Sequence, residues 1–86
     1  MSDNSKILII DDELGPREAM RMILKDYYDV ATAASAREGL EYLLKNKTDL
    51  VILDIKMPDM DGITALKKIK EEQSDIEVIM VTAYAS

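Results

Sequence analysis

The sequence has no cysteine, no histidine, no phenylalanine and no tryptophan. Without cysteine the chain can form neither a disulfide nor a thiolate metal site, which is typical of a protein in a reducing compartment. Without histidine it lacks the usual proton shuttle and any histidine-assisted nucleophile. The first seven residues, MSDNSKI, are polar and acidic, unlike a signal peptide. We therefore expect a cytoplasmic protein.

Positive charge is also scarce, because 11 lysine and arginine residues stand against 17 aspartate and glutamate residues, for a net charge of -6. Such a chain has no basic face that could follow a phosphate backbone or an anionic membrane surface. No apolar run approaches the length needed to span a bilayer. We expect neither direct binding to nucleic acid nor a membrane partner.

The sequence does contain enough apolar material for one small domain over residues 1–86, since 48% of its residues are hydrophobic. This length is close to the size at which a single core is only marginally sufficient. Several apolar runs are continuous rather than alternating, which is typical of parallel strands covered on both faces. The runs predict strands at residues 6–10, 49–53 and 77–81, with a weaker fourth candidate at 28–34.

Apolar residues recur at helical spacing in the three intervals between these runs. The intervals predict helices at residues 16–26, 35–46 and 62–72. Pro16 suits a first helical turn. Ser35 and Glu38 match a capping box, and Asp61 is a good N-cap. The stripe of the first helix consists of Ala19, Met20, Ile23, Leu24 and Tyr27. This alternation of strands and helices predicts an α/β fold of parallel βαβ units with right-handed crossovers.

Acidic residues gather at the ends of the predicted strands. Asp11 and Asp12 follow the first strand, Asp54 follows the third, and Thr82 follows the fourth. Each residue alone also fits an ordinary turn or helix-dipole position, as Asp59 does in the turn that begins at Pro58. The carboxyl ends of parallel strands share one edge of a sheet, however, where α/β folds place their ligands. Carboxylate oxygens without nitrogen or sulfur ligands suit Mg²⁺, so we predict a magnesium site.

Three segments carry a resemblance to a known family: ILIIDDE at 7–13, LVILDIKMPDMDG at 50–62 and VIMVTAY at 78–84. Their order and spacing resemble the receiver domain of two-component response regulators. The resemblance implies a flavodoxin-like three-layer sandwich with strand order 2-1-3-4-5. It covers all 86 residues but only about the first seventy per cent of a receiver. We therefore expect a truncated receiver with order 2-1-3-4, in which the fifth strand and the last two helices are missing.

The resemblance also assigns metal ligands. It implies that Asp12 binds Mg²⁺ directly, that Asp11 acts largely through water, and that Asp54 contributes a carboxylate oxygen. Lys56 matches a position whose backbone carbonyl binds the metal, so its side chain need not matter. Magnesium is therefore the expected cofactor.

The same resemblance implies a phosphorelay function, in which Asp54 accepts a phosphoryl group. Thr82 matches the hydroxyl that bonds this group, and the backbone amide of Ala83 lies beside it. Because the chain has no histidine, a phosphohistidine donor must belong to a partner, either a sensor histidine kinase or a phosphotransfer protein. No residue matches the family's phosphate-binding lysine or its aromatic switch residue, so we expect impaired phosphorylation.

Two other functions compete with this interpretation. One is an inert structural or assembly fragment. The other is a Mg²⁺-dependent phosphatase of the haloacid dehalogenase type, which requires an acid two residues after the nucleophile, where this chain has Lys56. That mismatch argues against an enzyme. We further expect a homodimer through residues 77–81, because this apolar strand becomes a sheet edge in the order 2-1-3-4.

Overall fold

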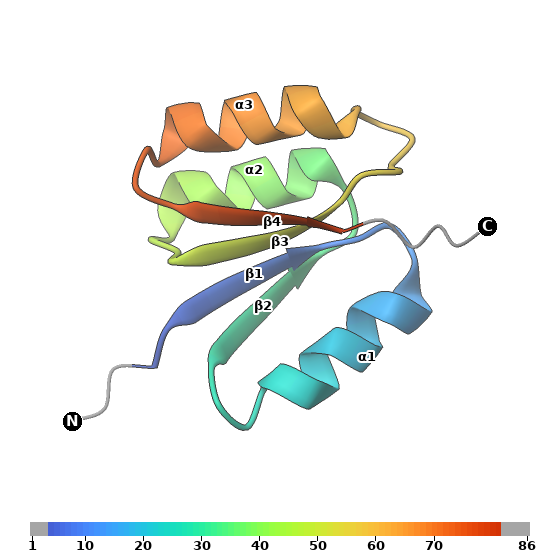
Figure 1. Ribbon diagram of the computed structural model, residues 1–86, viewed down its shortest axis with the longest axis vertical. Helices are drawn as coiled ribbons and strands as arrows, with labels where there is room; N and C mark the ends of the chain where they lie inside the picture. The colour runs from blue at the N-terminus through green and yellow to red at the C-terminus, as the bar shows by residue number, and fades with distance from the viewer. Residues whose placement is uncertain (1–3, 82–86) are drawn as a thin grey trace.

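Four parallel strands form the middle layer of a three-layer fold (Figure 1). The computed structural model describes residues 4–81. The strands are β1 (Lys6–Ile10), β2 (Asp29–Ala33), β3 (Leu50–Asp54) and β4 (Glu77–Val81). The helices are α1 (Leu14–Leu24), α2 (Ala36–Lys45) and α3 (Gly62–Glu72). The sheet order is β2-β1-β3-β4, with α1 on one face and α2 and α3 on the other. The predicted α/β sandwich and its strand order are confirmed.

The strand register aligns the carboxyl ends of β1 and β3. Ile10, the last residue of β1, pairs with Leu53, the residue before the end of β3. Asp54 in turn pairs with Val81 at the end of β4. The residues that follow β1 therefore lie beside the end of β3, which is the arrangement that the site described below requires.

The core divides into two parts because successive side chains of a strand point to opposite faces of the sheet. On the side of α2 and α3, the larger cluster includes Leu8, Ile10 and Leu53, all nearly inaccessible to solvent. On the side of α1, the smaller cluster is formed by Ile7, Ile9 and Ile52. The residues of β1 after Lys6 are thus buried on both faces, as the continuous apolar run predicts.

A glycine allows α2 to pack closely on β1. A Cβ atom at Gly39 would lie 2.4 Å from Cδ1 and 2.8 Å from Cγ1 of Ile10. These distances are shorter than any van der Waals contact, so any larger residue would require the buried Ile10 side chain to move. Gly39 is therefore a packing residue in the interior of α2.

Helix α1 differs from its prediction in both its bounds and its buried face. It begins at Leu14 and ends at Leu24, so Pro16 is its third residue and Tyr27 lies beyond it. Met20 and Leu24 pack against the sheet, but Ala19 is exposed, as are Ile23 at 67% and Tyr27 at 71%. Among the described elements, α1 alone lies on its face of the sheet (Figure 1), so the flanks of its apolar stripe have no neighbour.

The predicted N-caps of the other two helices are confirmed. Ser35 Oγ accepts the backbone N–H of Glu38 at 3.1 Å, and Asp61 Oδ1 accepts that of Thr64 at 3.0 Å. The reciprocal bond of the capping box is shifted by one residue, because Glu38 accepts the N–H of Ala34. Across residues 4–81, the structure contains no helix with the length and apolar character that a membrane crossing requires.

Candidate functional site

Three carboxylates meet at the carboxyl edge of the sheet. Oxygens of Asp11, Asp12 and Asp54 all lie within 4.8 Å of one another. Asp11 and Asp12 directly follow β1, and Asp54 is the last residue of β3. The structure therefore brings together the three acids that the sequence places at this edge.

Two of the three acidic residues are almost fully buried, with Asp11 5% exposed and Asp54 7% exposed, whereas Asp12 is exposed. Asp11 Oδ1 accepts the backbone N–H of Glu13 at 2.9 Å, and Asp54 Oδ1 accepts that of Lys56 at 3.2 Å. A carboxylate can accept about four hydrogen bonds or ligand contacts. Each buried acid is thus oriented by a backbone amide and keeps capacity to bind a cation.

Burial raises the pKa of Asp54 above its ordinary value, and the negative charges of Asp11 and Asp12 raise that pKa further. The hydrogen bond from the Lys56 amide acts in the opposite direction but does not cancel these effects. Both causes of the raised pKa oppose a negative charge at Asp54. A divalent cation among the three carboxylates would favour the ionised form.

The residues present fit a magnesium ion. Every side chain of the cluster offers a hard oxygen, and Mg²⁺ is usually bound through one or two carboxylates with waters or phosphate oxygens completing an octahedron. Asp12 is exposed at the edge of the cluster, so solvent and a phosphate group can reach it.

The segment 55–61 leads from β3 to α3 and is fixed at several points. The side chain of Met57 is buried in the larger core cluster. Asp59, which the sequence presents only as a turn residue, accepts the backbone N–H groups of Ala36 and Arg37 at the start of α2. The partners are more than twenty residues apart, so no local sequence signal indicates this contact.

The remaining predicted site residues, Thr82 and Ala83, lie outside the described residues. The nearest described position is Val81, whose backbone carbonyl accepts the N–H of Ile55 at 3.0 Å. The end of β4 therefore lies next to the residue that follows Asp54.

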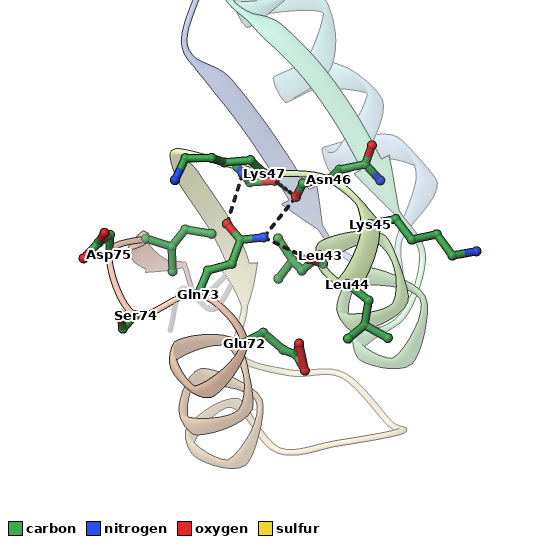
Figure 2. Close-up of a pocket in the computed structure, with 11 residues that line it drawn as sticks. Leu43, Leu44, Lys45, Asn46, Lys47, Glu72, Gln73, Ser74 and Asp75 are labelled. Atoms are coloured by element: carbon green, nitrogen blue, oxygen red, sulfur yellow. Dashed lines mark hydrogen bonds between the residues drawn. The ribbon is translucent and has the colours of Figure 1, made fainter.

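Apart from the acidic cluster, a hollow of about 530 Å³ lies where α2 and α3 end (Figure 2). Gln73 is central to it: its side-chain oxygen accepts the N–H of Thr48 at 3.1 Å, and its nitrogen donates to the carbonyls of Leu43 and Asn46 at 2.9 and 3.0 Å. The amide is therefore committed to contacts within the protein. Sequence reasoning missed this residue, and we interpret it as structural.

The sequence and the fold match a known family. Residues 7–86 match the family described as response regulator receiver domain. The chain belongs to the receiver domain family. It is 43% identical over 82 residues to sporulation initiation phosphotransferase F of Bacillus subtilis, covering 94% of this chain and 66% of that protein. It is 40% identical over 85 residues to the transcriptional regulatory protein ZraR of Escherichia coli, covering 98% of this chain and 19% of that protein.

Solved receiver structures have the same fold. A CheY-like receiver domain from Methanospirillum hungatei superposes with a TM-score of 0.91 at 38% identity, covering 98% of this chain and 68% of that one. The response regulator TrrA of Thermotoga maritima, solved in complex with Mg²⁺ and BeF, gives a TM-score of 0.86 at 35% identity, covering 94% and 71%. The chain thus spans less than two thirds of the curated relatives it matches and about seven tenths of these structures.

Proposed function

We propose that this receiver accepts a phosphoryl group on Asp54 in a Mg²⁺-dependent reaction. The observation that carries the proposal is the cluster of three carboxylates within 4.8 Å of one another, in which Asp54 is buried. The metal would be held by Asp11, Asp12 and Asp54 together with the backbone carbonyl of Lys56. When bound, it would neutralise charge on the phosphoryl oxygens and hold them in position.

The chemistry is a transfer between two nucleophiles. A carboxylate oxygen of Asp54 forms a bond to phosphorus, the bond from phosphorus to the donor nitrogen breaks, and that nitrogen leaves with the electron pair and takes up a proton. The product is a mixed anhydride. The Lys56 N–H holds one carboxylate oxygen at 3.2 Å and so fixes the orientation of the attacking group. Thr82 and the Ala83 amide are proposed to bond the transferred group.

The donor is proposed to be a phosphohistidine on a sensor histidine kinase or a phosphotransfer protein. This chain has no histidine, so the donor residue cannot be its own. The cytoplasm is the proposed setting, which suits a chain without cysteine. None of the lysines in these 86 residues matches the position at which the family pairs a lysine with the phosphoryl group. We therefore propose that phosphorylation of Asp54 in this chain is weak. A lost charge-assisted hydrogen bond costs about 1.5–3 kcal/mol.

Mass spectrometry after incubation with Mg²⁺ and a small phosphodonor tests the proposal. The wild type is expected to gain at most one phosphoryl group, slowly and without turnover, and Asp54→Asn is expected to gain none. Asp75→Asn is the matched control, because it removes an exposed carboxylate outside the acidic cluster. Labelling that persists in Asp54→Asn contradicts the assignment. Multiple turnover would favour the phosphatase alternative, and no labelling of the wild type would favour an inert fragment.

We also propose a homodimer in which a second copy covers β4. Of the strands that the structure describes, β4 lies at one edge of the sheet, and its sequence EVIMV has one charged residue, Glu77. Beside it, on the face of α1, lies a hollow of about 420 Å³ lined mainly by apolar side chains, including Ile7, Ile52 and Ile79. Exposed edges and apolar patches of this kind favour association.

A further inference from the structure

Asp59 connects the segment 55–61 to a helix that is remote in the sequence. Its Oδ1 accepts the backbone N–H of Ala36 at 3.3 Å, and its Oδ2 accepts that of Arg37 at 3.0 Å. Ala36 and Arg37 are the first two residues of α2. One carboxylate therefore binds both leading amides of the helix, across 23 and 22 positions of the chain.

This contact satisfies backbone groups that the helix cannot satisfy itself. The first N–H groups of a helix have no partner within it, and the helix dipole favours a negative charge at this end. The cap residue Ser35 accepts the N–H of Glu38 and leaves the amides of Ala36 and Arg37 to Asp59. The interaction combines two charge-assisted hydrogen bonds with the dipole, so it can fix the position of Asp59.

The position of Asp59 has consequences for Lys56, three residues earlier. On one side, the Lys56 amide is bonded to the carboxylate of Asp54. On the other side, the chain passes the buried Met57 and then reaches Asp59. Only four residues separate Asp54 from Asp59, and one of them is Pro58, whose backbone φ angle is fixed by its ring. The path of the Lys56 backbone therefore depends on both ends being held.

We propose that Asp59 is a positioning residue for the metal site, which holds the Lys56 carbonyl in place by anchoring the segment to α2. The inference rests on the proposed function, since it takes this carbonyl as a ligand of Mg²⁺. It also implies coupling in the other direction: Mg²⁺ at the carboxylate cluster shifts the opening equilibrium of the first turn of α2 toward the closed state, because linked equilibria are reciprocal. Asp59 itself is not a metal ligand.

The experiment compares two variants that each remove one cap of α2. Asp59→Ala removes the anchor of the segment, whereas Ser35→Ala removes a cap whose side-chain hydrogen bond is made to the backbone of α2 itself, at Glu38. Mg²⁺ affinity is measured by titration with MgCl₂, followed through backbone amide shifts in NMR spectra. Asp59→Ala is expected to raise the Kd about threefold to tenfold. This is at or below the lower limit of about tenfold for residues that bond a metal ligand directly, because Asp59 acts on the Lys56 carbonyl only through the chain. Ser35→Ala is expected to leave the Kd unchanged.

Hydrogen exchange provides a second measurement. In the wild type, saturating Mg²⁺ is expected to slow exchange of the α2 first-turn amides at least twofold, and in Asp59→Asn this effect is expected to disappear. Asp59→Asn keeps one acceptor oxygen and loses the charge, so it remains informative if Asp59→Ala does not fold. Equal Kd values for the wild type and the Asp59 variants would overturn the inference, as would an equal loss in Ser35→Ala. A wild type that does not bind Mg²⁺ would overturn the proposed metal site itself, and the wild-type titration alone reveals it.

Discussion

The carboxylates of Asp11 and Asp54 lie within 4.8 Å of each other although both side chains are almost fully buried. Two like charges at such a separation repel by about 1 kcal/mol in water and by more in a less polar environment. The strand register enforces this proximity, because the end of β1 pairs with the end of β3. The fold therefore holds negative charge together at a cost to its own stability.

The first prediction concerns how the loss of folding stability caused by these buried charges depends on pH. The pKa of Asp54 is raised in the folded state, so the folded protein binds this proton more tightly than the unfolded chain does. The stabilisation from this group is present below the ordinary pKa of 3.8 and is lost as the pH rises through the raised pKa. Without metal, Asp54→Asn should therefore be more stable than the wild type at neutral pH, by about 1 kcal/mol or more, but not at low pH.

Urea unfolding from pH 3 to pH 7 in the presence of a chelator measures this difference. The advantage of Asp54→Asn should grow as the pH rises. Asp75→Asn is the control, since Asp75 is exposed and has no part in the acidic cluster. A difference between Asp54→Asn and the wild type that stays constant over the whole pH range would refute the explanation.

The second prediction concerns magnesium. A ligand that binds only the folded state at ten times its Kd stabilises that state by about 1.4 kcal/mol, which corresponds to about 6–11 °C in Tm for a domain of this size. We expect this rise in Tm for the wild type. Asp12→Asn should show a smaller rise and a higher Tm without metal, because it removes both a ligand and a repulsive charge. An unchanged wild-type Tm on addition of Mg²⁺ would rule out the metal site in this chain.

The order of elements could be predicted because it depends on local signals. Continuous apolar runs indicate buried parallel strands, and Asp61 and the pair Ser35 and Glu38 indicate helix starts. The clustering of Asp11 and Asp54 could also be predicted from the sequence, because parallel strands bring their carboxyl ends to one edge of the sheet. These predictions needed only the period of the sequence and the topology of βαβ units.

Contacts between distant segments could not be predicted in the same way. Asp59 and Gln73 look like ordinary polar residues of a turn and a helix end, but both bind backbone groups more than twenty residues away. The exposure of Ile23 was missed for a related reason. The periodicity identifies an apolar stripe, but how much of it is buried depends on which elements lie beside the helix.

The third prediction concerns Gln73, whose amide links the ends of α2 and α3 (Figure 2). In Gln73→Glu, a carboxylate replaces the group that donates to the carbonyls of Leu43 and Asn46. These two carbonyl oxygens lose their hydrogen-bond donor and are repelled by the carboxylate. The free energy of unfolding should therefore fall by about 1–3 kcal/mol at pH 7. Below the usual glutamate pKa of about 4.3, the protonated carboxyl can donate again and part of the loss should be recovered.

Thermal melts of Gln73→Glu at pH 7 and pH 4, each relative to the wild type, test this account. Ser74→Ala serves as a control at the neighbouring exposed position. Equal destabilisation by Gln73→Glu at the two pH values would show that the donated hydrogen bonds are not the cause.

The last prediction concerns association through β4. Ile79 is 50% exposed in the middle of this strand, beside the apolar hollow that Ile7 and Ile52 also line. Its side chain is not part of either buried core cluster, so a charge there should leave the fold of one copy largely unchanged. If a second copy covers this edge, Ile79→Lys places two charges at equivalent positions of a two-fold contact. It should then raise the dimer Kd at least tenfold, which corresponds to about 1.4 kcal/mol.

Sedimentation equilibrium across a dilution series measures the dimer Kd. Ile63→Lys is the matched control, because Ile63 is 58% exposed but belongs to α3. The control adds the same charge to an exposed isoleucine of a different element, so a general effect of net charge on association would appear in both variants. Dimerisation that weakens in Ile79→Lys and persists in Ile63→Lys would place the contact at β4. A wild type that stays monomeric at high concentration would exclude the homodimer, and equal weakening by both lysines would exclude the β4 edge as its specific contact.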